Sequence, residues 1–136
     1  EAVIADGSGL KKLKQMVRAQ GGDADQIEHP ELLPKADFIT PVFSKERGYI
    51  RRARALELGR LAMEIGAGRE TKEDVIHPET GIVLGKKTGD FVKPGDILAW
   101  VHHRGSLGEE WLERLYTAFE MSAEPVPEKQ LIYKTL

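Results

Sequence analysis

The chain has 136 residues, of which 40% are hydrophobic and 31% charged, a composition typical of one globular domain or of one domain plus a short extra piece. Its net charge is -2, from 20 basic and 22 acidic residues, so nothing indicates a nucleic-acid partner, which would favour a net basic face. Cysteine is absent, which excludes disulfides and thiolate zinc sites and is compatible with the cytoplasmic location that we expect.

The N-terminal residues 1–6 contain neither a basic segment nor a long apolar run, so we expect no signal peptide. No apolar stretch approaches the roughly 20 residues that a membrane-spanning helix needs. The first residue is Glu rather than Met, which suggests that the sequence is a piece of a longer protein.

The first predicted element is an amphipathic helix over residues 8–20, with Ser8 as its expected N-cap and Gly21-Gly22 as its stop. Its apolar side chains recur at helical spacing: Leu10, Leu13, Met16 and Val17. Lysines occupy the opposite side of the helix. A single helix must bury such a stripe against another element, and no apolar partner is evident nearby. We therefore expect this helix to have lost its original neighbours.

Residues 23–35 form an expected connector with one short turn at 31–33, because its prolines interrupt any helix. Strands are expected next at 37–43 and 48–52, where β-branched and aromatic residues gather. Pro41 cannot donate a ladder hydrogen bond, so the first of these should be an edge strand or should break there.

A helix over residues 55–65 is predicted to end at the glycine cluster 66–68, followed by a polar loop at 69–78 and a strand at 81–85. A phosphate-binding loop requires glycines between a strand and the start of a helix. These glycines follow a helix instead, so we interpret them as its C-cap.

The stretch 86–102 contains two turn signals, at 89–90 and 94–96, on either side of the short strand 91–92. Residues 97–101 are apolar throughout, which predicts a strand buried on both faces. A last helix is expected over residues 109–121, and a final strand at 131–133. One wide apolar stripe supports that helix: Trp111, Leu112, Leu115, Tyr116 and Phe119.

The residues offer little for catalysis or metal binding. The histidines do not form a chelating pattern, since His102 and His103 would point to opposite faces of a strand while His29 and His77 precede prolines in loops. The serines lack a nucleophile motif: Ser44, Ser106 and Ser122.

Residues 6–9 precede a helix and would bind an anion only weakly, without the Lys-Ser/Thr ending of a P-loop. The carboxylates at 109, 110 and 113 are explained by the start of the last helix. The sequence by itself thus predicts a small α+β module with no catalytic, cofactor-binding or metal-binding residue in this chain.

Two families share the pattern of residues 86–102. In biotinyl and lipoyl carrier domains, a similar hairpin precedes an exposed turn that carries an acceptor lysine. No lysine lies between Lys93 and Lys129, and residues 102–105 stand where that turn would be. A stand-alone carrier-like binding or interaction module without the acceptor lysine is therefore the alternative hypothesis.

The second resemblance extends over most of the chain, to the C-terminal portion of the pyrimidine-nucleoside and thymidine phosphorylases. Besides the hairpin, the similar segments follow in the family's order: Leu13-Lys14-Gln15-Met16-Val17, Ala19-Gln20-Gly21-Gly22-Asp23, Leu32-Leu33-Pro34, Gly48-Tyr49, Gly66-Ala67-Gly68-Arg69, Thr71-Lys72-Glu73-Asp74, Gly81-Ile82-Val83-Leu84 and Leu131-Ile132-Tyr133. Two departures are minor: Leu13 replaces the usual Phe, and residues 102–105 are more basic than usual.

The resemblance implies a parent enzyme that is a transferase, more narrowly a pentosyl- or glycosyltransferase of pyrimidine metabolism. Such enzymes carry out reversible phosphorolysis of thymidine or uridine, giving free base and (deoxy)ribose 1-phosphate, with phosphate as co-substrate and no other cofactor implied. They are cytoplasmic homodimers with an active site in a cleft between a small helical and a large α/β domain. The residues of that site precede the matched portion, so no position here inherits a role.

Within this family, residues 35–136 would be the C-terminal domain, an α/β hammerhead with a barrel-sandwich-like β-sheet and packed helices. Residues 1–34 would be a helix remnant of the large α/β domain plus a connector. The remainder of the parent enzyme is then the expected partner, and the isolated chain is expected to be inactive.

Overall fold

The computed structural model describes residues 2–127 and residue 134. The chain divides into two compact units, Glu1–Pro34 and Lys35–Leu136. Within the described part, no helix is both long and apolar enough to cross a bilayer.

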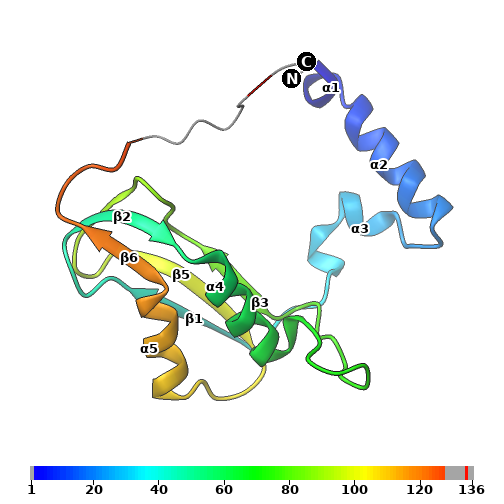
Figure 1. Cartoon of the computed structure of the whole chain (residues 1–136). Helices are drawn as coiled ribbons and strands as arrows, with labels where there is room; N and C mark the ends of the chain where they lie inside the picture. Colours follow the sequence, from blue (N-terminus) through cyan, green and yellow to red (C-terminus); the bar gives the residue numbers. More distant parts are fainter. Residues whose placement is uncertain (1, 128–133, 135–136) are drawn as a thin grey trace. The chain divides into compact units, whose positions relative to one another are not determined.

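The first unit is built from short helices (Figure 1). Their bounds are α1 Ala2–Ala5, α2 Ser8–Ala19, α3 Asp25–Glu28 and the 3-10 turn η1 Pro30–Leu32. Helix α2 confirms the amphipathic helix expected from the sequence. It ends as expected, because the Gly22 N–H donates to the Val17 carbonyl and the Gly21 N–H to the Arg18 carbonyl, the Schellman arrangement.

The start of α2 differs from the prediction. Gly7 is the N-cap and Ser8 is already the first helical residue. The Ser8 N–H donates to Oδ1 of Asp6 at 2.8 Å. The prediction of Ser8 as the cap was wrong because a carboxylate two residues earlier accepts that free amide, and a charged acceptor forms the stronger bond.

The second unit contains two antiparallel sheets and two α-helices (Figure 1). Its elements are β1 Phe38–Phe43, β2 Gly48–Ala53, α4 Ala55–Ala62, the π-turn η2 Met63–Ala67, β3 Gly81–Leu84, β4 Phe91–Val92, β5 Ile97–His103, α5 Glu109–Thr117 and β6 Phe119–Ser122. The strand orders are β1-β5-β3 in one sheet and β4-β2-β6 in the other. This arrangement confirms the predicted α+β class.

In the β1-β5-β3 sheet, the apolar strand β5 is central, as its composition predicts. Leu98 and Ala99 are adjacent and both are 0% exposed, so the strand is buried on both faces at this point. Pro41 lies on β1 opposite Trp100. β1 is an edge strand, which confirms the prediction made from Pro41.

In the β4-β2-β6 sheet, the central strand β2 pairs with β4 through Gly48 and Tyr49. The turns expected on either side of β4 are present: the Lys87 N–H donates to the Asp90 carboxylate, and the Lys93 N–H to that of Asp96. Both carboxylates close their turns, as Asx side chains commonly do.

The last predicted helix is too long. α5 ends at Thr117, and Phe119 begins a strand that pairs with Ala53 of β2. The Ala118 carbonyl accepts from the Arg54 N–H at 2.9 Å, which starts this pairing instead of another helical turn. Phe119 is only 5% exposed, so the strand buries the side chain that the helical periodicity had included.

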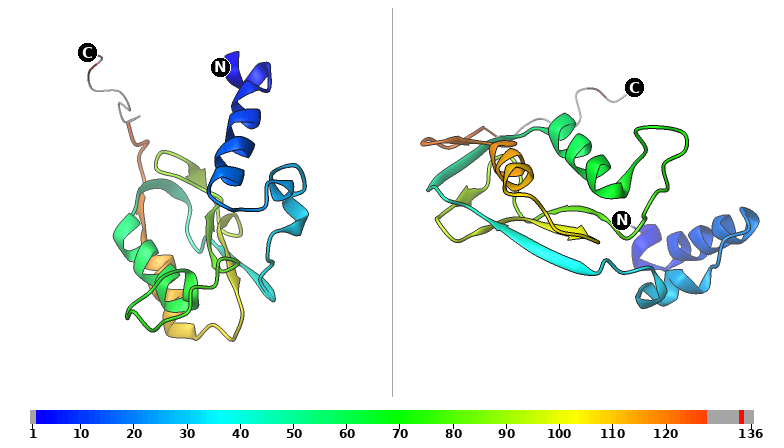
Figure 2. Two further views of the ribbon diagram at one scale, coloured as in Figure 1. Left: turned by 90° about the vertical axis from the view of Figure 1, so that its right-hand side faces the viewer. Right: turned by 90° about the horizontal axis from the view of Figure 1, so that it is seen from below.

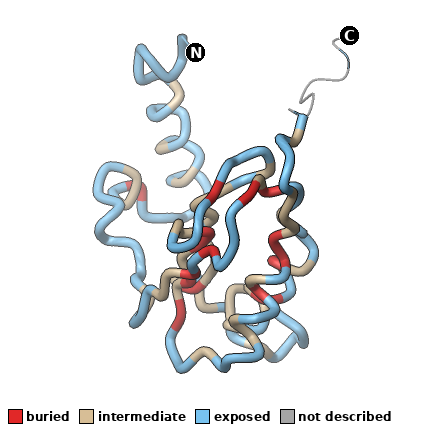
Figure 3. The backbone as a smooth tube through the Cα atoms, turned by 90° about the vertical axis from the view of Figure 1, so that its left-hand side faces the viewer, coloured by how far each residue is buried: buried red, intermediate tan, exposed pale blue. Residues whose placement is uncertain are grey.

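Helices α4 and α5 lie on one side of the β1-β5-β3 sheet (Figures 1 and 2) and complete a single core in the second unit. The fully buried large side chains are Ile50, Leu61, Val92, Leu98, Val101 and Leu115. Figure 3 shows the buried positions gathered in this unit, whereas α2 is exposed along most of its length. The predicted strand at 131–133 lies outside the described residues.

Candidate functional site

The end of α4 lines two hollows of the second unit. The helix widens into the π-turn η2, in which Gly66 has a φ of 100°. A Cβ at Gly66 would lie 2.9 Å from Cδ2 of His77, so a side chain is excluded by space as well as by conformation. The C-cap interpretation of this glycine cluster is confirmed, and no helix follows it that could hold a phosphate.

Asp74 organises the loop that follows. Its carboxylate accepts hydrogen bonds from the backbone N–H groups of Glu70 and Thr71 and from the Thr71 hydroxyl, each at 2.8 Å. These bonds, with those from Thr71 strongest, lower the pKa of the Asp74 carboxyl below its ordinary value. Thr71 and Asp74 therefore have a structural role, which is to hold this loop in its conformation.

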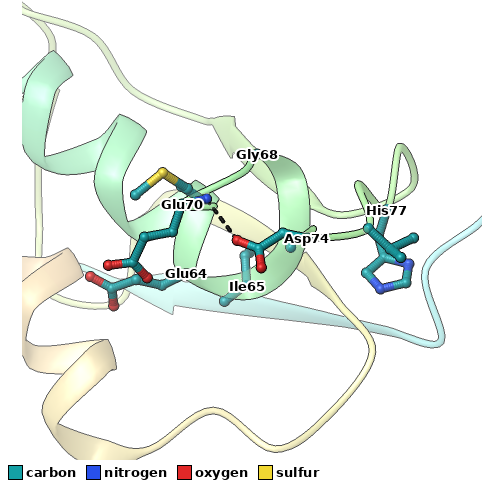
Figure 4. Close-up of a pocket in the computed structure, with 9 residues that line it drawn as sticks. Glu64, Ile65, Gly68, Glu70, Asp74 and His77 are labelled. Atoms are coloured by element: carbon teal, nitrogen blue, oxygen red, sulfur yellow. Dashed lines mark hydrogen bonds between the residues drawn. The ribbon is translucent and has the colours of Figure 1, made fainter. Parts of the chain in front are cut away.

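An open hollow of about 420 Å³ lies between this loop and the end of α4. Figure 4 shows the carboxylates of Glu64 and Glu70 pointing to one side of the loop, with His77 at the opposite end. The Glu64 carboxylate accepts two hydrogen bonds from Arg114 of α5, at 2.7 and 2.9 Å. That carboxylate therefore ties the turn to α5.

Arg104 connects three segments around His77. Its Nη1 lies 2.9 Å from Nδ1 of His77, and its Nε lies 3.6 Å from Glu79 and 3.8 Å from Asp37. A guanidinium only donates, so Nδ1 of His77 is the acceptor in this contact. The backbone N–H of His77 donates to the Gly66 carbonyl at 2.8 Å, which holds the loop against the end of α4.

His103 is buried and both of its ring nitrogens are engaged. One contacts the Gly105 carbonyl, which only accepts, so Nδ1 carries the proton. Nε2 lies 2.8 Å from the Thr40 hydroxyl oxygen, within hydrogen-bond distance. With 6% exposure and no free nitrogen, His103 is placed to stabilise the end of β5 and is unsuited to proton transfer with a substrate.

The serines considered from the sequence are not paired with a histidine base by any observed hydrogen bond. Ser44 is buried, and its hydroxyl donates to the Glu46 carbonyl. The Ser122 hydroxyl accepts from the Glu124 N–H, and Ser106 is exposed in the loop before α5. Within residues 2–127 and 134, no group of three His, Asp or Glu side chains is placed to hold a metal ion.

At the start of α2, the Asp6 carboxylate already accepts the hydrogen bond of the Ser8 N–H, which a bound anion would need. Hydrogen bonds from Ser8, its side chain first and then its backbone, lower the pKa of the Asp6 carboxyl, so the group is ionised at neutral pH. A negative charge at this place disfavours the weak anion site considered for residues 6–9.

The carrier hypothesis also meets a structural obstacle. His102 and His103 are the last residues of β5, where they pair with Ile39 and Phe38 of β1. Residues 102–105 therefore do not form the free, exposed turn that a swinging-arm carrier modifies.

Two structural roles were missed by reasoning from the sequence: Asp74 as the acceptor that closes its loop, and Arg104 as the link between segments. Asp74 has a local signal, because Thr and Asp three residues apart can bond within a turn. The contact between Arg104 and His77 joins positions 27 residues apart, so no local pattern could have indicated it.

A comparison with protein-family models matches residues 49–122 to the pyrimidine nucleoside phosphorylase C-terminal domain. The match runs from β2 to β6 and includes α4, the loop of Asp74, and α5. The chain belongs to this family. The resemblance seen in the sequence is thereby confirmed.

Relatives from this family match more of the chain. The pyrimidine-nucleoside phosphorylase of Geobacillus stearothermophilus is 40% identical over 98% of the chain and 31% of its own length. The enzymes of the same name from Staphylococcus haemolyticus and Staphylococcus aureus are 38% and 36% identical, over 89% and 98% of the chain. The chain spans only about 30% of the length of these relatives.

As a C-terminal domain of this family, the second unit has a hollow at the end of α4 in which three polar lining side chains are bonded to neighbouring groups of the chain. Glu64 is engaged by Arg114, Asp74 by Thr71, and His77 by Arg104. We call residues 68–80 the braced loop, because side-chain bonds within the loop and to Arg104 hold it in place.

Proposed function

We propose that this chain is the C-terminal portion of a pyrimidine-nucleoside phosphorylase, a pentosyltransferase that converts thymidine or uridine and phosphate into free base and (deoxy)ribose 1-phosphate. The observation that carries the proposal is the 40% identity to the Geobacillus stearothermophilus enzyme over 98% of the chain. Phosphate is the co-substrate of the proposed reaction, and it involves no other cofactor.

Within that enzyme, the chain contributes a scaffold. The braced loop supports this role, since His77, His103 and Asp74 are all held by neighbouring groups of the chain itself. A rigid domain behind a cleft helps to align two substrates and to exclude water when the cleft closes, which is the effect we assign to it. The reacting groups come from the part of the enzyme that precedes this chain.

The partners follow from the same proposal. The chain packs against the helical and large α/β domains of its own polypeptide, and the parent enzyme is a cytoplasmic homodimer. Residues 1–34 belong to the large domain, which would explain why Leu10, Leu13 and Met16 remain 41–49% exposed.

A phosphorolysis assay tests the proposal. The purified 136-residue chain and the full-length protein are each incubated with phosphate and either thymidine or uridine, and release of free base is followed. We expect release by the full-length protein alone, dependent on added phosphate. Full-length protein that releases no base from either nucleoside would contradict the assigned activity.

Release of base by the 136-residue chain would contradict the scaffold role. A chain carrying Leu61→Ala and Leu115→Ala, purified in the same way, controls for contaminating host phosphorylase, because loss of its core should abolish any activity of its own.

A further inference from the structure

Within the described residues of the second unit, one face of the β1-β5-β3 sheet lacks the cover that the other face receives. Successive side chains of a strand point to opposite faces. Ala99 and Val101 of β5 are 0% exposed, and their cross-strand partners Val42 and Ile82 also belong to the core or pack against it. Trp100 and His102 therefore point to the other side, and both are only partly buried.

Two cross-strand rows define this outer face. In the first row, Pro41 of β1 and Val83 of β3 lie on either side of Trp100. In the second row, Ile39 and Gly81 lie on either side of His102. The name outer face refers below to these six residues.

The outer face is mostly apolar, with His102 as its one polar side chain, where water would favour polar side chains. Ile39 is 57% exposed and Val83 is 51% exposed, and none of the six residues is Asp, Glu, Lys or Arg. An antiparallel sheet with one solvated face normally carries polar side chains on that face. Exposed apolar patches of this kind commonly mark interaction sites.

Near the start of β5, the same side of the sheet is covered. Leu98 points the same way as Trp100, yet it is 0% exposed and belongs to the core. The side is therefore closed near the start of β5 and opens beyond Leu98, at the two rows of the outer face.

The chain's relatives indicate the occupant. They are about three times as long as the part that this chain matches, and the family model describes the matched part as C-terminal. We propose that the outer face is the docking surface for an apolar surface of the polypeptide that precedes this chain in the full-length protein. This inference rests on the proposed function for the existence of that polypeptide, and it adds the surface that receives it.

Hydroxyl-radical footprinting read by mass spectrometry tests the contact directly. The 136-residue chain and the full-length protein are labelled side by side. In the chain alone, we expect Trp100 and Ile39 to be oxidised readily. In the full-length protein, we expect their labelling to fall to the level of the buried Leu98. Leu56, which is 67% exposed on α4, is the control whose labelling should not change.

Arginine substitutions give a second, independent readout. Val83→Arg and Ile39→Arg should leave the melting temperature of the 136-residue chain unchanged, because both positions are half exposed there. In the full-length protein they should lower the melting temperature of the domain, since a charge would be buried at the contact. Leu56→Arg is the matched control, with no effect expected in either protein.

The outcomes separate this inference from the proposed activity. Equal labelling of Trp100 in the chain and in an active full-length phosphorylase would overturn the docking surface and leave the activity standing. Protection in a full-length protein that releases no base would uphold the surface and remove the activity. Protection that grows with concentration of the 136-residue chain alone would identify a second copy as the occupant and overturn the inference.

Discussion

At the residue scale, Gly95 shows how a single backbone angle constrains the hairpin between β4 and β5. Its φ is 91°, a left-handed value that costs little only for glycine. We expect Gly95→Val to lower the free energy of unfolding by at least about 1 kcal/mol, by conformational strain alone, because a Cβ at this position meets no atom within 4 Å. Thermal and urea unfolding of the chain would measure it.

Gly59 is the matched control for that prediction. It lies inside α4, is exposed, and also has open space where a Cβ would be. Gly59→Ala should stabilise the chain by about 0.5–1 kcal/mol, because alanine loses less backbone entropy in a helix. Equal effects at the two positions would show that the left-handed angle is not the cause.

Asp74 makes the stability of its loop depend on pH. Its pKa is lowered in the folded state by the Thr71 and Glu70 bonds, so its stabilising contribution is present above the ordinary carboxyl pKa. The contribution is lost as the pH falls through the lowered folded value. Hydrogen exchange of the Glu70 and Thr71 amides should therefore be protected at pH 6, after correction for intrinsic rates, and lose protection in strong acid.

The Asp74→Asn variant isolates this contribution. The amide keeps the shape of the side chain and removes its charge, so we expect weak protection of the two amides and a reduced pH dependence of that protection. Protection as strong as that of the unsubstituted chain would assign the ordering of the loop to other contacts.

At the scale of elements, the sequence could predict what rests on local chemistry. The Gly66 cap, the turns closed by Asp90 and Asp96, and the position of Pro41 on an edge strand follow from backbone rules that act within a few residues. The strand at 119–122 could not be predicted in this way. Phe119 fits the helical stripe of α5 and equally fits a strand, and only the pairing with Ala53, far away in the chain, decides between them.

The braced loop was harder still to foresee. The contact of Arg104 with His77 depends on where β5 ends relative to the loop, which the sequence pattern does not contain. The family resemblance marked residues 102–105 as more basic than usual, and two residues of that stretch, His103 and Arg104, bond to other parts of the chain.

The packing of α5 gives the prediction that belongs to this scale. Leu115 is the buried anchor of that helix, with 0% exposure, and α5 contacts both α4 and β6. Leu115→Ala should lower the free energy of unfolding by about 2–5 kcal/mol, from lost burial and the cavity that remains. Leu56→Ala, at an exposed position of α4, should change it by less than about 0.5 kcal/mol. Chemical unfolding followed by far-UV circular dichroism would compare the two, and similar losses would contradict the assigned core.

At the scale of the whole molecule, the two units differ in how they satisfy their apolar side chains. The second unit closes a core of its own, whereas among the described residues of the first unit only Ala24 is buried and apolar. Helix α2 carries an apolar stripe that its own short unit leaves exposed, and the stripe must find a partner outside that unit. The proposed origin of residues 1–34 in a larger domain accounts for this imbalance.

In the chain on its own, that stripe should make the protein self-associate. Leu13 and Met16 are 41% and 49% exposed on α2, and joining such surfaces removes apolar area from water. We expect light scattering to show a mass that rises with concentration.

Leu13→Glu combined with Met16→Glu should bring the mass to that of a monomer without changing the melting temperature of the second unit. Lys11→Glu adds a negative charge to the same helix outside the stripe and should leave the association in place. A strictly monomeric chain with slowly exchanging amides along α2 would show that the helix has all the partners it needs, and the proposal that residues 1–34 are a remnant of a larger domain would lose its support.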